Sequence, residues 1–377
     1  MEQLLLNISD FTFHDLYKPE KLSQLTELFF TELKQKNSSL FEKFSRYKEN
    51  KGIGFSEIEI SNLLVEVAPY LNNFIAKMLC VENEMKAKKL FAEKEHIVFK
   101  CKKEFFTRRV LKKYSAEIVQ QFDIQKLTTQ IDSLKKGFAG IPNDDAELEL
   151  SAMILELWEI ERFIKDALTG ERKNYLIKFS ERLKNEKLLA NILPQNETEE
   201  SLKQFLSNTL SLYEQFLAHH YFNEHSPHKH WAMFKQPKKV EFEHLVELQV
   251  IQPNFNVGIE KHYRRRDGFD LTDERYSPRE VMSEVDYCIF CHDRNKDACS
   301  KGIHDNGAFK KNPLDYTLKG CPLDQKISES HTVENNGDII GALAIIMIDN
   351  PMCPGTDRKS TRLNSSHVSE SRMPSSA

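Results

Sequence analysis

The sequence lacks several features that would assign the chain to a class of protein. No apolar run approaches the roughly 20 residues needed to cross a bilayer; the longest run is 339–348. The N-terminal residues MEQLLLNISDF contain no basic segment, so they do not form a signal peptide. The net charge of −4 provides no positive excess for holding nucleic acid or an anionic membrane. We therefore expect a cytoplasmic protein with neither as a partner.

Two further absences limit the functions that this chain can have. No G-x-G-x-x-G fingerprint occurs, so no flavin- or nicotinamide-binding domain is encoded in these 377 residues. No repeat of fixed period is present. The apolar content of 40% and the charged content of 29% are those of an ordinary globular protein, and the length allows two or three domains.

Residues 1–235 have helical periodicity with little strand patterning. The clearest helix begins at Ser56, where Ser56 and Glu59 match a capping box, and Pro69 is expected to kink or split it. Further helices are predicted after Asn143–Asp145, ending near Gly170, and from about Glu197. We predict a helical bundle of unknown role, in which Cys80 and Cys101 are small buried apolar residues.

A dense histidine patch lies at the end of this helical region. It contains His219, His220, His225, His228 and His230 beside Trp231. A metal site is one interpretation, because neutral imidazole is a good ligand. A polar, aromatic-rich helix end is the other, and we prefer it because Glu224 is the one carboxylate among these residues.

Residues 236–287 are predicted to be a linker with short elements, because proline and glycine interrupt them repeatedly. Val246, Leu248 and Val250 alternate with polar residues and indicate a short strand. The basic pair at 238–239 and the basic triplet at 264–266 indicate a solvated face or an anionic partner. Ser277-Pro278 indicates a helix start, with Ser277 as N-cap, leading toward Cys288.

Residues 287–355 contain five of the seven cysteines. These are Cys288, Cys291, Cys299, Cys321 and Cys353. A C-x2-C pair presents two thiolates from one turn, and two of the cysteines precede proline, which fixes φ and removes a donor N–H. In a reducing compartment, clustered thiols favour metal over disulfide. The pattern indicates iron–sulfur ligation.

The stretch from Cys288-Ile-Phe-Cys291 through Gly320-Cys321-Pro322 to Cys353-Pro354 resembles the two-cluster helical ferredoxin domain of the glutamate synthase small subunit and dihydropyrimidine dehydrogenase. It is most similar to bacterial FAD-dependent oxidoreductases resembling that subunit, which begin with a long helical extension. The resemblance covers about 70 residues and implies nothing about the first 235.

The resemblance implies a partial helical ferredoxin domain over 288–356 that transfers electrons between a redox partner and a downstream flavin domain. Cys288, Cys291 and Cys299 would hold one 4Fe–4S cluster, and Cys321 and Cys353 would begin the second. FAD and NAD(P) would belong to a missing C-terminal part. Residues 339–348 would be a buried helix, although their periodicity alone equally fits a strand.

Further cysteines expected after Cys353 are missing, and the sequence changes character at Asp357. Residues 357–377 resemble a translated sequencing adapter, which is excluded from fold reasoning. A Ser/Arg-rich disordered tail would have a similar composition. We therefore expect a mainly α protein, with an N-terminal helical bundle and a truncated helical-ferredoxin-like iron–sulfur domain, encoded by the N-terminal part of an oxidoreductase gene.

A different interpretation of the cysteines is a zinc-binding structural module on a helical scaffold. Cys288, Cys291, Cys299 and Cys321 would form its tetrahedral ligand set, which leaves Cys353 without a role. His292 and His331 lie near these cysteines in the sequence. Either could replace a ligand, but a hydrogen-bonded or surface histidine is the more usual case.

Overall fold

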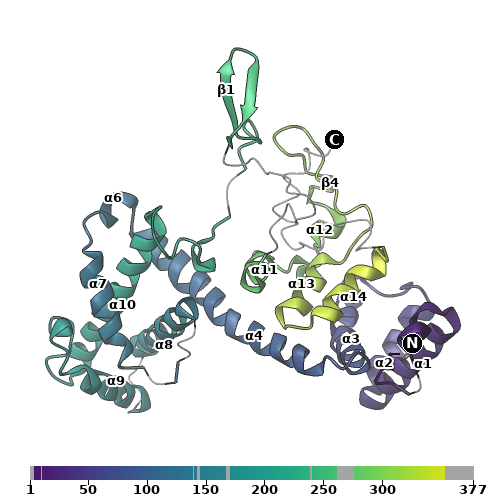
Figure 1. Cartoon of the computed structure of the whole chain (residues 1–377), viewed down its shortest axis with the longest axis horizontal. Coiled ribbons are helices and arrows are strands. Elements are labelled where there is room, and N and C mark those ends of the chain that lie inside the picture. Colours follow the sequence, from purple (N-terminus) through teal and green to yellow (C-terminus); the bar gives the residue numbers. More distant parts are fainter. Residues whose placement is uncertain are drawn as a thin grey trace. The chain divides into compact units, whose positions relative to one another are not determined.

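The structure is a computed structural model that describes residues 4–9, 11–138, 140–141, 145–166, 170–237, 240–260 and 276–352. Within these ranges the protein is mainly helical, and its strands form two short hairpins (Figure 1). The chain divides into two compact units: unit 1 combines residues 1–92 with 237–377, and unit 2 is residues 93–236. The helical region expected over 1–235 is thus shared between the two units.

The N-terminal part of unit 1 is a layer of helices. It contains η1 (Phe13–Tyr17), α1 (Pro19–Lys36), α2 (Ser38–Glu49), α3 (Glu57–Met78) and the start of α4 (Glu82–Lys100), which continues into unit 2. The first three α-helices pack around a common apolar core. Its buried members are Phe29, Leu33, Leu40, Leu63, Val67 and Phe74.

Helix α3 confirms the predicted start, and of the kink or split expected at Pro69 the split does not occur. The Glu59 carboxylate accepts the Ser56 N–H at 2.8 Å, while Ser56 Oγ accepts the Glu59 N–H, completing the capping box. Pro69 lies inside the helix, which runs unbroken to Met78. Proline removes one intrahelical hydrogen bond, and packing on both sides of α3 outweighs that loss.

Helices α13 (Ile327–Asn335) and α14 (Ile339–Asp349) pack on α3, although more than 240 residues separate them in the sequence (Figure 1). Their shared core contains Leu64, Ala68, Val333, Ala342 and Ile345. Residues 339–348 are therefore helical, and only one side of α14 is buried, since Leu343 and Ile348 are exposed.

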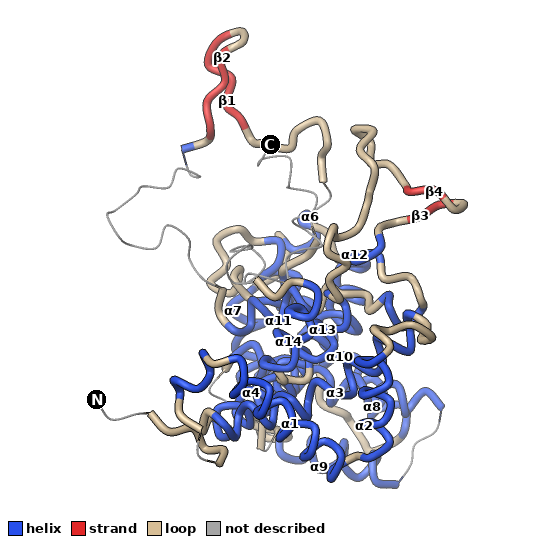
Figure 2. The backbone as a smooth tube through the Cα atoms, turned by 90° about the vertical axis from the view of Figure 1, so that its right-hand side faces the viewer, coloured by secondary structure: helices blue, strands red, loops and turns tan. Residues whose placement is uncertain are grey.

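The rest of unit 1 consists of short elements. They are β1 (Leu248–Gln252), β2 (Phe255–Gly258), α11 (Pro278–Val285), η6 (Cys291–Arg294), α12 (Ala298–Lys301), β3 (His304–Asp305) and β4 (Ala308–Phe309). Strands β1 and β2 pair antiparallel, with Leu248 opposite Gly258, and β3 pairs antiparallel with β4 (Figure 2). The strand predicted around Val246–Val250 is confirmed by β1.

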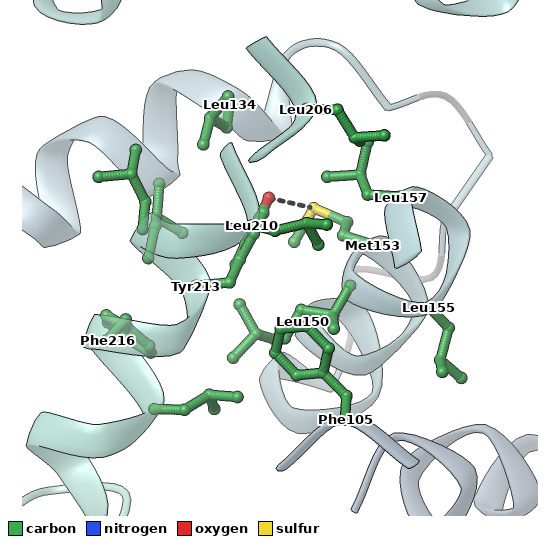
Figure 3. Packing of buried hydrophobic residues seen from close by; sticks show 14 of the residues in the cluster. Phe105, Leu134, Leu150, Met153, Leu155, Leu157, Leu206, Leu210, Tyr213 and Phe216 are labelled. Atoms are coloured by element: carbon green, nitrogen blue, oxygen red, sulfur yellow. Dashed lines mark hydrogen bonds between the residues drawn. The ribbon is translucent and has the colours of Figure 1, made fainter. Parts of the chain in front are cut away.

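Unit 2 is helical throughout its described residues. Its elements are the end of α4, η2 (Cys101–Val110, π-helical), α5 (Leu111–Lys113), α6 (Ala116–Val119), α7 (Ile124–Lys135), α8 (Ala146–Asp166), α9 (Gly170–Leu183), η3 (Lys187–Leu189), α10 (Glu199–Phe222) and η4 (Ala232–Phe234). Buried side chains of α7, α8 and α10 meet in one core, where the Tyr213 hydroxyl lies 3.8 Å from Met153 Sδ (Figure 3).

The two isolated cysteines have different environments. Cys101 is fully buried in the core of unit 2, as predicted, and burial raises the pKa of its thiol. Cys80 is exposed, which corrects the prediction. It lies at the end of α3 with a left-handed φ of 57°, so its position is that of a turn residue and not that of a helical core residue.

Candidate functional site

Helix α11 leads the chain into the cysteine-rich region. It begins as predicted: Ser277 is the N-cap, and its N–H donates to the Glu280 carboxylate at 2.8 Å while its Oγ accepts the Glu280 N–H at 3.3 Å. The helix ends at Val285, and Cys288 follows in a buried position. Phe290 then adopts a left-handed φ of 48°, which turns the chain into η6.

Both sulfur atoms of the C-x2-C pair accept hydrogen bonds. Cys288 Sγ accepts the N–H of Phe290 at 3.4 Å and lies 3.6 Å from the Ser328 hydroxyl oxygen. Cys291 Sγ accepts the N–H of Ala298 at 3.2 Å. Donors directed at sulfur favour the negatively charged thiolate. The bond from Ala298 also holds the residue before Cys299 against Cys291.

The backbone brings Cys299 and Cys321 together. The Cys321 N–H donates to the Cys299 carbonyl at 2.8 Å, although the β3–β4 hairpin lies between them in the sequence. Gly320 permits this approach, because a Cβ there would be 2.1 Å from the carbonyl oxygen of Ser300. Hydrogen bonds thus connect the C-x2-C turn to the segment of Cys299, and that segment to Cys321.

A buried histidine lies beside the thiols. His292 Nδ1 is 2.6 Å from the Ser328 hydroxyl oxygen, and its Nε2 is 3.1 Å from a carboxylate oxygen of Asp293. The same Ser328 hydroxyl contacts Cys288. His292 is therefore the hydrogen-bonded histidine that the sequence interpretation preferred, tied to Cys288 through one shared partner.

The site also contains a buried carboxylate from α13. Ser61 Oγ in α3 donates to Glu329 Oε1 at 2.5 Å, and both residues are buried. Among the described residues, Glu329 Oε2, Ser300 Oγ and Gln325 Nε2 are buried without a hydrogen-bond partner. Each such atom costs about 1–3 kcal/mol, so the polar surroundings of the thiols have unused hydrogen-bonding capacity.

Burial dominates the electrostatics of the site. It raises the pKa of the Cys288 thiol, against hydrogen bonds from the Phe290 N–H and Ser328 that lower it. Burial also raises the pKa of Asp297 to about 6, with a further increase from the charge of Glu329. Burial thus moves the pKa of both groups toward the protonated form relative to water.

The predicted ligands are only partly placed by the structure. Cys288, Cys291 and Cys299 are buried, Cys321 is half-buried, and Cys353 lies outside the described residues, as do 261–275 and the whole of 357–377. In the described part of the chain, no three histidine, cysteine, aspartate or glutamate side chains are gathered closely enough to hold a metal ion. The assignment of these cysteines as ligands of a 4Fe–4S cluster stays a prediction.

Sequence reasoning missed the residues that support the thiols from the helical layer. Ser328 and Glu329 occupy α13, where adjacent polar residues suggest solvent exposure, yet both are fully buried. The partner of Glu329 is Ser61, 268 residues earlier. No local pattern marks such a pair. A weak signal was available in Ser61 itself, a polar residue among the apolar positions of α3.

The histidine patch of unit 2 is an aromatic cluster. The ring of His220 lies 4.3 Å from that of Phe216 and 4.6 Å from that of His228, and His228 lies 4.3 Å from Trp231. Burial lowers the pKa of His220 to about 3, and the neighbouring His228 lowers it further. The ring contacts are those of an aromatic-rich helix end.

Comparison with known proteins finds a family model that matches the N-terminal helices and a relative that matches most of the chain. Residues 6–80 match the RP005 N-terminal alpha-helical domain. The chain is also 23% identical over 330 residues to the "Uncharacterized protein RP005" of Rickettsia prowazekii (strain Madrid E), covering 83% of this chain and 93% of that relative. No solved structure matches the chain.

These matches correct the resemblance drawn from the cysteine motifs. They contain no glutamate synthase subunit, no dihydropyrimidine dehydrogenase and no helical ferredoxin domain, and they begin in the region for which the resemblance implied nothing. Because none of these matches supports the resemblance, the identification of the chain as part of an iron–sulfur oxidoreductase is wrong. Cluster binding and electron transfer by these cysteines stay predictions. The inferred truncation of the gene rested in part on that resemblance, and it stays a prediction.

None of the described helices is both long and apolar enough to pass through a membrane. The redox or flavin partner expected from the resemblance has no support in the comparisons, and the absence of a nucleic-acid partner stays a prediction.

Proposed function

We propose that residues 288–326 form a zinc-binding structural module mounted on the α3, α13 and α14 layer of unit 1. The ligands would be the thiolates of Cys288, Cys291, Cys299 and Cys321. The observation that carries the proposal is a pair of hydrogen bonds that link the cysteine segments: Ala298, next to Cys299, donates to the Cys291 sulfur, and Cys321 donates to the Cys299 carbonyl.

Zinc fits this ligand set by its chemistry. It takes four thiolates in a tetrahedron, has no redox activity, and serves as a cross-link between loops in proteins. The N–H groups of Phe290 and Ala298 already point at two of the sulfurs, and such donors hold a thiolate in place beside a metal. The unused donors on Ser300 and Gln325 flank the other two cysteines and could serve the same purpose.

Zinc binding would be coupled to a local rearrangement. The described thiols are not yet gathered closely enough to hold an ion, so the Cys288–Cys291 turn and the Cys299–Cys321 pair would close around zinc as it binds. Metal sites in small modules commonly form in this way, with binding free energy appearing as folding free energy. The fixed layer below, held by Ser61 and Glu329, would give the closing loops a rigid base.

The test is metal analysis of the protein purified without oxygen. About one zinc per chain, with no iron and no acid-labile sulfide, is expected. Cobalt added to metal-free protein should give a sulfur-to-cobalt charge-transfer band in the near ultraviolet. Cys288→Ser and Cys321→Ser should each lose zinc, whereas Cys80→Ser, at the exposed cysteine, should retain it.

Two outcomes would overturn the proposal. Iron with stoichiometric sulfide would assign the thiols to a cluster. Zinc retained by the double variant Cys288→Ser/Cys321→Ser would place the ion elsewhere in the chain. Circular dichroism of each variant, together with the fluorescence of Trp158 and Trp231 in unit 2, would show whether a loss of zinc reflects the ligand or general unfolding.

A further inference from the structure

A second candidate site lies at the other end of the helical layer of unit 1. A cavity of about 590 Å³ opens between α1, the last turns of α3 and the first turns of α4. Its volume is in the range of small-molecule sites. All its lining residues lie between Glu32 and Lys89, so it is independent of the cysteines and of any metal.

The lining has a surplus of positive charge. Four lysines, Lys36, Lys77, Lys86 and Lys89, face the cavity with two glutamates, Glu32 and Glu82, which leaves two positive charges in excess. Uncompensated lysines around a concave surface attract and hold anions, because low-dielectric walls concentrate their field.

Two of the four lysines are already neutralised within the protein. Lys36 pairs with Glu32 at 2.5 Å, and Lys89 pairs with Asp338 at 2.7 Å. Lys77 and Lys86 make no salt bridge with any residue in the described ranges. The positive charge that remains comes from Lys77 on α3 and Lys86 on α4, and Glu82 in the lining reduces it to a net of one positive charge.

A hydrogen-bonded turn joins α3, which carries Lys77, to α4, which carries Lys86. The Val81 N–H donates to the Ala76 carbonyl at 2.9 Å and the Cys80 N–H donates to the Lys77 carbonyl at 3.2 Å, with Cys80 in the left-handed region. This pair of bonds is a Schellman motif, which ends α3 and directs the chain into α4. The site is thus built on two helices joined by a rigid turn.

The floor of the cavity is apolar. Ala76 and Met85 line it and are both buried. A ligand with one anionic end and one apolar part would match a cavity with lysines at its rim and a small, adaptable methionine surface below.

We propose that this cavity binds a small phosphorylated molecule, with its phosphate between Lys77 and Lys86 and its apolar part against Ala76 and Met85. Lysine is a common phosphate ligand and acts as a point charge. The positive end of α4, whose first residue Glu82 lines the cavity, adds to the attraction for a phosphate. The carboxylate of Glu82 opposes it, so this residue tunes the affinity downward.

The experiment uses phenyl phosphate as probe, phenol as its neutral counterpart and inorganic phosphate as the anion alone, titrated into the full chain by calorimetry. Phenyl phosphate should bind more tightly than either of the others, and more weakly as salt is raised. Lys77→Gln/Lys86→Gln should weaken it by at least about tenfold, and Glu82→Gln should strengthen it by several-fold.

The control is Lys88→Gln, which removes one positive charge from an exposed position of α4 that does not line the cavity, and is compared with Lys77→Gln and Lys86→Gln taken singly. It should bind like the natural chain. Equal weakening by Lys88→Gln and by the two single cavity variants would show nonspecific attraction and overturn the proposal, as would no binding of phenyl phosphate at millimolar concentration. Unchanged circular dichroism of the variants keeps the comparison valid.

Discussion

The side-chain oxygen of Asn72 in α3 accepts the backbone N–H of Ile340 at 3.1 Å, and so caps the N-terminus of α14. The residue in the N-cap position, Asp338, makes no side-chain cap bond of its own. A helix start that lacks a local cap is thus satisfied by a residue 268 positions earlier. This bond joins the N-terminal and C-terminal segments that together make up unit 1.

Replacing this cap should loosen α14. We expect Asn72→Ala to lower the stability of α14 by about 1–2 kcal/mol, because the first N–H groups of the helix lose their buried acceptor. Native-state hydrogen exchange at Ile340 and Gly341 measures it directly. Asn73→Ala, at the exposed neighbour, is the control. Equal exchange rates in the two variants would show that Asn72 does not cap the helix.

The crossing of α14 over α3 depends on a missing side chain. A Cβ on Gly341 would lie 2.7 Å from the Ala68 carbonyl oxygen, so the helices approach more closely than any other residue permits. Gly341→Ala should destabilise unit 1 by about 1–3 kcal/mol through overpacking, despite the better helix propensity of alanine. Urea unfolding followed by circular dichroism measures the change. Leu343→Ala, at an exposed position of α14, should have a smaller effect, and the reverse order would contradict the close crossing.

Cys80 is a left-handed residue where glycine is preferred. Its φ of 57° strains any side chain with a Cβ, and the C′ position of a Schellman motif favours glycine. Cys80→Gly should therefore stabilise the protein by about 0.5–1 kcal/mol, an increase visible as a higher melting temperature. Cys80→Ala removes the thiol and keeps the Cβ, so it should change little. A larger gain for alanine than for glycine would assign the effect to the thiol.

Acid should destabilise unit 2. The pKa of His220 is lowered from 6.5 to about 3, chiefly by burial, and the neighbouring His219 and His228 are lowered as well. Below pH 6.5 the imidazole of His220 is protonated in the unfolded chain but stays neutral in the folded unit. The stability conferred by neutral His220 is therefore present above that pH and is lost progressively as the pH falls toward about 3.

Both tryptophans, Trp158 and Trp231, lie in unit 2, so their fluorescence follows its unfolding in urea. From about pH 7 to about pH 5 the free energy of unfolding should fall by about 1 kcal/mol per pH unit on average from this residue. His220→Gln should make the decline shallower, while His225→Gln, at an exposed position, should leave it unchanged. A decline of equal steepness in both variants would exclude His220 as its source.

Local signals in the sequence predicted local structure well. The capping box at Ser56 and the N-cap at Ser277 both start helices where expected, because a side chain and the amides it caps lie within four residues. The split predicted at Pro69 does not occur. The penalty for a proline inside a helix is local, whereas the packing that stabilises α3 comes from residues far away in the sequence. The burial predicted for Cys80 was wrong because apolar periodicity does not show where a helix ends.

The candidate site was predicted only in part. The cysteine spacing selected the residues of the candidate site, but the family resemblance drawn from it is contradicted by the comparisons, because thiol spacing is shared by several kinds of site. The support from Ser61 to Glu329 and the capping of α14 by Asn72 could not be predicted. Both join residues 268 apart, and the pairing depends on a fold that places α13 and α14 on α3.

The division of unit 1 between the two ends of the chain has a consequence during synthesis. A nascent chain emerging from the ribosome presents α3 long before α13 and α14 exist, with Leu64 and Ala68 unprotected by their eventual neighbours. All of unit 2 can fold in that interval. The apolar side of α3 must stay uncovered, or be held by a chaperone, until about 250 further residues have been translated.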